Sequence, residues 1–169
     1  MDAQASDGGW PWIEGLPSSV HITDEILQGL GLLIENGIME VTPELKDMLQ
    51  RGLDYLDAEF YKEYNVDKKP ESLGYGQLSY LLTRSYYNGY PFKGLSRASH
   101  TYFSRLAEIE DTHNLSLYFR SQLALLMARN GKRDQAKRIA ATLLERSLYN
   151  DEMGRYWRDN QAGLLWHEA

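Results

Sequence analysis

The sequence contains no cysteine among its 169 residues. Disulfide bonds, thiolate zinc sites and a cysteine nucleophile are therefore excluded within it. It also has no apolar run that approaches the roughly 20 residues needed to cross a bilayer, so we expect no direct membrane insertion. The first residues show neither the basic nor the apolar segment that is typical of a signal peptide.

Basic residues are fewer than acidic ones. Lys and Arg number 18 against 24 Asp and Glu, which gives a formal net charge of −6. Proteins that bind nucleic acids or anionic membranes generally carry a basic excess, so we expect no nucleic-acid partner. The P-loop, the Rossmann glycine pattern and the His-Glu-x-x-His zinc motif are missing from the sequence. We therefore predict no cofactor and no metal.

The sequence does contain strong helical periodicity and many aromatic residues. Its apolar fraction is 43%, and Tyr occurs 12 times, a composition that is typical of a folded domain. Helix start and stop signals predict six helices, at about 19–36, 42–63, 72–87, 96–110, 115–129 and 132–147. Because short connections favour antiparallel neighbours, we predict one all-α domain over residues 1–169, whose hairpins stack into a superhelix or close into an α/α toroid.

The first helix shows the pattern that underlies these predictions. Its apolar residues recur at spacings of four, four and three, which predicts one buried face made of Ile22, Ile26, Leu30 and Leu33. Gly29 and Gly31 inside it suggest the close approach of another helix. His21 and Glu25 share a face at a spacing that suits a metal or an acid/base pair, although two residues alone do not make a site. Asp24 is expected to act on the helix dipole.

Two segments rich in glycine and tryptophan lie outside these helices. The first is Asp7-Gly8-Gly9-Trp10-Pro11-Trp12, and it cannot form a helix interior because it combines Gly with Pro. Its tryptophans could bind a ligand through their exposed faces, but we interpret them as structural side chains that pack over the end of the first helix. The second segment runs from Gly154 to Gly163 and predicts a loop with short extended pieces.

These two segments carry a resemblance to a known family. Asp7 to Trp12, followed by the helix from Ile22 to Gly31, and later Met153 to Gly163, resemble segments of bacterial α2-macroglobulin-like proteins, above all the large forms of Bacteroidetes. The resemblance spans most of the chain. It marks nine residues as structural landmarks and none as catalytic: Asp7, Gly8, Gly9, Trp10, Trp12, Tyr156, Trp157, Asp159 and Asn160.

The resemblance implies the thioester-type helical domain of that family, an α/α toroid within a much larger protein built mostly of β-sandwiches. Such proteins entrap proteases that cut a bait region, and the bacterial forms lie in the periplasm or at the outer membrane. The implied partners are the other domains of the parent chain and host or competitor proteases. The family's thioester Cys would lie upstream of Asp7. We expect an excised, incomplete piece of the toroid, which dimerises through its exposed apolar edges or is only modestly stable.

Two other functions remain open from the residues alone. An α/α-toroid enzyme acting on polysaccharides or isoprenoids would need convergent carboxylates. The candidates, which we expect on solvated faces and at helix ends, are Asp57, Glu59, Glu108, Glu110 and Asp111. A tetratricopeptide-like peptide-binding module would use the hairpin at 118–144, although the chain shows no 34-residue repeat. His100, His113 and His167 are isolated, and we expect them at the surface or at helix caps.

Overall fold

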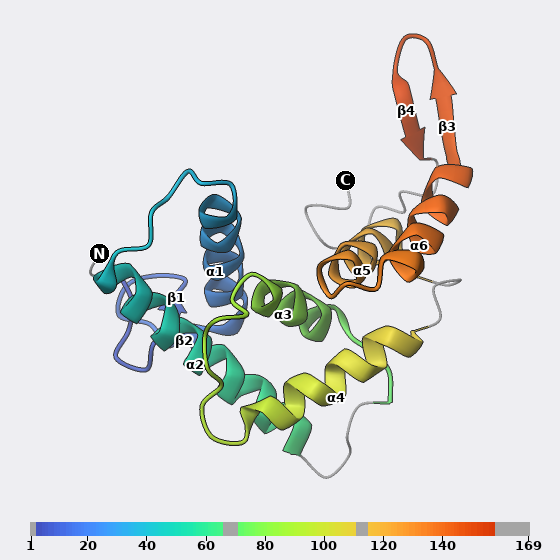
Figure 1. Cartoon of the computed structure of the whole chain (residues 1–169). Coiled ribbons are helices and arrows are strands. Elements are labelled where there is room, and N and C mark those ends of the chain that lie inside the picture. Colours follow the sequence, from blue (N-terminus) through green and yellow to red (C-terminus); the bar gives the residue numbers. More distant parts are fainter. Residues whose placement is uncertain (1–2, 66–70, 111–114, 158–169) are drawn as a thin grey trace. The chain divides into compact units, whose positions relative to one another are not determined.

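The computed structural model describes residues 3–65, 71–110 and 115–157. Within them the chain forms six helices and two short hairpins, which confirms the predicted all-α class (Figure 1). The helices are α1 (Val20–Glu35), α2 (Pro43–Asn65), α3 (Tyr75–Ser85), α4 (Ser96–Ile109), α5 (Leu117–Arg129) and α6 (Arg133–Glu145). The strands are β1 (Trp10–Pro11), β2 (Ser18–Ser19), β3 (Ser147–Asn150) and β4 (Gly154–Trp157). None of the helices in the described ranges is long and apolar enough to cross a membrane.

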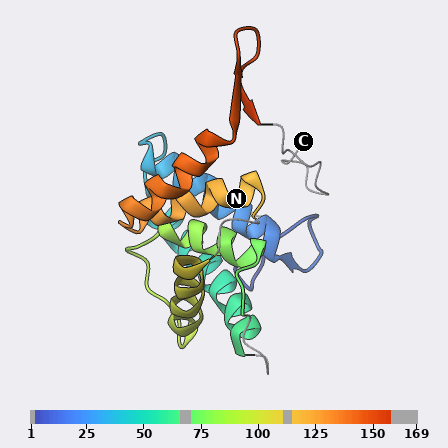
Figure 2. The same cartoon turned by 90° about the vertical axis from the view of Figure 1, so that its right-hand side faces the viewer.

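The chain divides into two compact units, Met1–Glu108 and Ile109–Ala169, which we describe separately. In the first unit, α1 and α2 pack against each other, and both pack against α3 (Figures 1 and 2). All of its residues from Leu78 to Ser85 are buried, polar ones included. This helix therefore carries much of the core of the unit, and its polar side chains must find partners inside the protein.

Local capping signals place the helix ends as the sequence predicts. The Ser19 side chain caps α1 by accepting a hydrogen bond from the Ile22 amide. Gly37, at φ +68°, ends the same helix, and the next amide, of Ile38, donates to the Leu33 carbonyl at 3.0 Å. Thr42 caps α2 through the Leu45 amide at 3.2 Å. The start of α3, at Tyr75, lies three residues later than the predicted position.

The buried face of α1 differs from the predicted one. Ile22, Ile26, Leu30 and Leu33 are only half-buried, whereas the buried residues are Thr23, Asp24, Leu27 and Gly31. The helix is thus turned so that two polar side chains point inward, where both find hydrogen-bond partners. Gly31 does allow a close approach, because a methyl group there would lie 2.7 Å from Cβ of Tyr86. Gly29 faces open space.

Aromatic rings join α4 to the rest of the first unit. The Phe103 ring meets Phe60 of α2 edge-on, with centroids 6.3 Å apart. Phe60 in turn stacks on Tyr80 of α3 at 4.3 Å, and Tyr80 meets the His100 ring of α4 at 6.0 Å. Aromatic pairs of this kind add to the free energy gained from their buried area. They place the first turns of α4 beside the C-terminal half of α3.

The second unit is a helical hairpin followed by a β-hairpin. Gly131, at φ +76°, turns the chain from α5 into α6, and the Lys132 amide donates to the Met127 carbonyl at 2.8 Å. Beyond α6, β3 pairs antiparallel with β4 from Ser147↔Trp157 to Asn150↔Gly154. From the sequence we predict helix as far as Ser147 and then a loop-like tail with short extended pieces around Tyr156 and Trp157. The strand β4 agrees with that expectation, whereas β3 lies where the helix end and the loop were expected.

Candidate functional site

The loop from Asp7 to Trp10 is held by its own backbone and by α2. The Asp7 carboxylate accepts hydrogen bonds from the Gly9 amide at 3.0 Å and from the Ser18 hydroxyl at 2.7 Å. Gly8 has φ +93°, and a methyl group on it would lie 2.4 Å from the Arg51 carbonyl oxygen. A methyl group on Gly9 would collide with Ser18 at 2.6 Å. Both glycines are therefore required by close packing and, at Gly8, by backbone conformation.

The two tryptophans of this loop have different environments. Trp10 is 7% exposed, and its amide donates to the Thr23 hydroxyl of α1 at 2.8 Å. Its ring packs on Gly52 of α2, so Trp10 joins α1 to α2. Trp12 is 71% exposed, so the expectation that both rings pack over the first helix is wrong for Trp12.

The second landmark segment lies partly in β4. Tyr156 and Trp157 are half-buried there, and the Trp157 indole N–H donates to the Leu143 carbonyl of α6 at 2.6 Å. This bond fastens the β-hairpin to the helix before it. Asp159 and Asn160 lie outside the described residues.

The candidate metal or acid/base pair on α1 is not supported by the geometry. His21 and Glu25 are both exposed. Across residues 3–65, 71–110 and 115–157, no three His, Cys, Asp or Glu side chains gather in a way that could hold a metal ion. Asp24, expected at the helix dipole, is instead 6% exposed, and Ser79 of α3 donates a hydrogen bond to its carboxylate.

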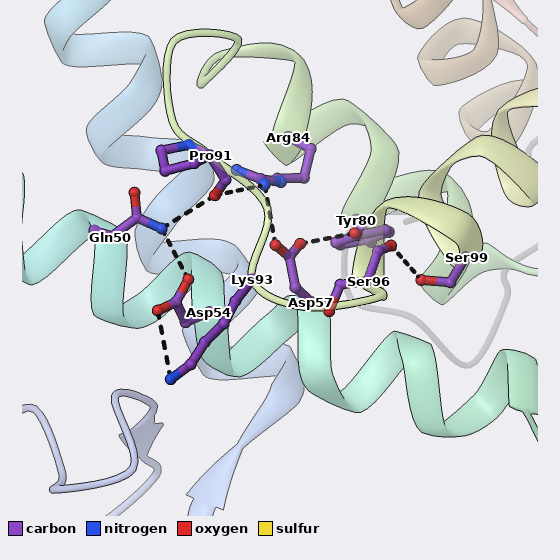
Figure 3. Close-up of polar contacts among 9 residues, drawn as sticks. All are labelled: Gln50, Asp54, Asp57, Tyr80, Arg84, Pro91, Lys93, Ser96 and Ser99. Carbon is purple, nitrogen blue, oxygen red and sulfur yellow. Dashed lines mark hydrogen bonds and ion pairs between the residues drawn. The ribbon is translucent and has the colours of Figure 1, made fainter.

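A second buried carboxylate, Asp57 of α2, also faces α3 (Figure 3). The Tyr80 hydroxyl donates to its Oδ1 at 2.8 Å, and Nη2 of Arg84 donates to its Oδ2 at 3.0 Å. The side chains of Asp57 and Arg84 are 0% and 1% exposed. The expectation that Asp57 is solvated is therefore wrong. Its partners lie 23 and 27 residues further along the chain, so the sequence around Asp57 does not indicate them.

Burial changes the protonation of both carboxylates. It raises the pKa of Asp24 to about 6, and hydrogen bonds from Ser79 and Thr83 limit the rise. It also raises the pKa of Asp57 to about 6, against the opposing effects of the Arg84 charge and the Tyr80 hydrogen bond. Both carboxylates accept hydrogen bonds from α3 and help to hold it in place.

A pocket of about 420 Å³ lies beside Arg84 in the first unit. Its lining comes from the end of α3, the loop after it and the start of α4, and consists of Arg84, Tyr87, Asn88, Phe92, Arg97, His100 and Thr101. The Arg84 guanidinium carbon lies 3.8 Å from the centroid of the Phe92 ring, and that of Arg97 lies 5.4 Å from it. The lining thus combines two cations with aromatic rings, and it includes no carboxylate.

This pocket was not predicted from the sequence. The periodicity and motifs lead to the opposite expectation for His100, a position at the surface or at a helix cap, whereas the ring is half-buried and lies 4.9 Å from the Phe92 ring. Burial, followed by the charges of Arg84 and Arg97, lowers the pKa of His100 to about 4, so the ring is neutral at physiological pH. An arginine within an apolar helix pattern, with an aromatic and basic segment after it, was the available signal.

The chain was compared with known proteins, and no family model, curated protein or solved structure matches it.

Proposed function

We propose that this chain is a non-enzymatic helical domain of an α2-macroglobulin-like protein that entraps proteases. The resemblance of the two landmark segments motivates the proposal, and the construction of the loop from Asp7 to Trp10 is the observation that supports it. Asp7 is bonded to Gly9 and Ser18, the two glycines pack against α2 and β2, and Trp10 is inserted between α1 and α2. Each of these groups has a structural role that accounts for its presence.

The arrangement of the carboxylates favours this function over an α/α-toroid hydrolase. A glycosidase needs two carboxyl groups facing each other across a cleft. Asp24 and Asp57 are instead buried and bonded to side chains of α3, and the pocket beside Arg84 is lined without any Asp or Glu. Neither buried carboxylate is therefore placed to act on a substrate there.

In this proposal the chain is part of an α/α toroid and contacts the other domains of a larger protein. It meets host or competitor proteases only through that full-length protein, in the periplasm or at the outer membrane. Its contribution is structural, because the buried bonds of α3 and the packing of Trp10 hold α1, α2 and α3 in one arrangement.

The test is a trapping assay with the full-length protein and a purified endopeptidase. Entrapment restricts access to the protease without blocking its active site. We therefore expect hydrolysis of a large protein substrate to fall while hydrolysis of a small peptide substrate continues. A full-length protein that leaves both activities unchanged, or that itself hydrolyses a polysaccharide, would refute the proposal.

The isolated chain offers a second test. Exposed apolar edges favour self-association or a modest stability, so we expect light scattering to detect a dimer or thermal unfolding to begin at a low temperature. A tight monomer with a high melting temperature would contradict this part of the proposal.

A further inference from the structure

The pocket beside Arg84 places two guanidinium groups against one aromatic ring. Arg84 comes from the last turn of α3 and Arg97 from the first turn of α4. Both face the Phe92 ring, at 3.8 and 5.4 Å from its centroid. The volume of about 420 Å³ falls in the range of small-molecule sites rather than of polymer grooves.

Arg84 is only partly satisfied by the protein. Its Nη2 donates to Asp57 at 3.0 Å and makes a long contact of 3.5 Å with the Pro91 carbonyl (Figure 3). Nε and Nη1 are buried, and neither has a hydrogen-bond partner among the residues that the structure describes. The side chain is 1% exposed. A buried N–H without a partner is costly, and more so on a charged group, so an acceptor that enters the pocket beside Arg84 would relieve that cost.

The charges around the pocket favour an anion. The Asp57 carboxylate on α2 balances the charge of Arg84. The lining of the pocket contains no carboxylate that could balance the charge of Arg97. Lys93, in the loop before α4, is paired with Asp54 at 3.9 Å. The first turn of α4 adds the positive end of a helix dipole. Burial is the main cause of the low pKa of His100, and the charges of Arg84 and Arg97 lower it further.

We propose that this pocket binds the oxyanion of a small molecule, a carboxylate or a phosphate, between Arg84 and Arg97. Guanidinium groups bind both kinds of oxyanion through charge-assisted hydrogen bonds. The neutral His100 ring has one further N–H to donate, and Tyr87 and Phe92 form aromatic walls for the rest of the ligand. This inference goes beyond the function proposed above and does not depend on it.

The test uses the 169-residue chain and three sodium salts at equal ionic strength: phosphate, succinate and chloride. Binding is followed through the ring resonances of His100 by NMR. We expect a saturable shift with phosphate or succinate at millimolar or lower concentration, a rise in the pKa of His100 when the anion is bound, and no saturation with chloride. Saturation by phosphate alone or by succinate alone identifies which oxyanion the site takes.

A pair of variants on α4 separates the site from general charge effects. Arg97→Gln removes a lining cation from an exposed position, and we expect the affinity to fall about tenfold or more, as for the loss of one charge-assisted hydrogen bond. Arg105→Gln removes the same charge from an exposed position of the same helix outside the pocket, and the affinity should not change. Absence of saturation with both oxyanions, or equal binding by the wild type and Arg97→Gln, would overturn the proposal.

Discussion

The indole ring of Trp10 lies so close to Gly52 of α2 that a methyl group on this glycine would come within 2.7 Å of the ring carbon Cζ3. Only a residue without a side chain allows the helix to approach the ring this closely. The loop and α2 are therefore joined by the contact between Trp10 and Gly52. The helix α1 is joined to the same loop residue, because the Thr23 hydroxyl accepts a hydrogen bond from the Trp10 amide.

Replacing Trp10 tests directly how much this contact stabilises the protein. Trp10→Ala should lower the free energy of unfolding by on the order of 3 kcal/mol, because a large buried aromatic is lost and a cavity remains. Trp12→Ala is the matched control, since its side chain is 71% exposed, and it should have little effect. Urea denaturation of both variants measures the difference. Equal stabilities would mean that Trp10 is not the structural side chain of the loop.

The two helical glycines at positions 52 and 29 should respond in opposite directions to alanine. Gly52→Ala places a methyl group against the Trp10 ring and Leu27, and we expect a loss of roughly 1–3 kcal/mol from overpacking. Gly29→Ala meets nothing within 4 Å and should stabilise α1 by roughly 0.5–1 kcal/mol, because alanine is the better helix former. Thermal unfolding followed by circular dichroism compares them. A destabilising Gly29→Ala would contradict the open space seen there.

Breaking the ion pair between Asp57 and Arg84 should be among the most destabilising changes in the first unit. Asp57→Ala leaves the buried Arg84 guanidinium and the Tyr80 hydroxyl without the carboxylate that accepts from both, and we expect a loss of about 3 kcal/mol or more. Asp47→Asn removes the acid of the exposed pair with Arg51 and should cost less than about 1 kcal/mol. Chemical denaturation near neutral pH provides the measurement. A small effect at Asp57 would show that the interior tolerates the unpaired charge.

Asp24 should give a measurable pH dependence of stability. Because its pKa rises to about 6 in the folded chain, the folded state holds this proton more tightly than the unfolded state does. Its contribution is therefore fully present below the ordinary pKa of 3.8 and is lost as the pH rises through about 6. A pKa rise of this size corresponds to about 3 kcal/mol.

The Asp24→Asn variant isolates this contribution. The raised pKa of Asp57 acts in the same direction and the lowered pKa of His100 in the opposite one, so the wild-type profile alone does not identify the residue. Urea denaturation between about pH 4 and 7 should show the wild type losing up to about 3 kcal/mol relative to the variant. A difference that stays constant with pH would show that Asp24 titrates normally.

Signals that act within a few residues were readable in the sequence. Ser19 and Thr42 cap their helices, and Gly37 and Gly131 end theirs, because each bonds to or turns its own backbone. The rotation of α1 was not readable. Periodicity favours the face with the most apolar residues, whereas the actual face is decided by polar partners far along the chain, such as Ser79 for Asp24.

The candidate site was hidden for the same physical reason. Arg84 and Asp57 lie 27 residues apart, and the arginine becomes a pocket wall only once α4 packs against α3 through aromatic rings. An arginine within an apolar helix pattern signals that it needs a partner, but it does not indicate which carboxylate or aromatic ring the arginine meets. The β3–β4 hairpin, in contrast, had a local signal, because Asn150 accepts hydrogen bonds from the amides of Glu152 and Met153 in the turn.

The adjacent residues Ser79 and Tyr80 of α3 bond to carboxylates on two different helices, α1 and α2. Neighbouring residues on a helix point about 100° apart, since 3.6 residues complete a turn. A purely apolar α3 could rotate about its axis or slide by a turn and still bury its surface. These two bonds favour one rotation of α3, so two adjacent residues help to set the angle between α1 and α2. A sequence that replaces Ser79 or Tyr80 and keeps this geometry must therefore also replace the acid that the residue meets.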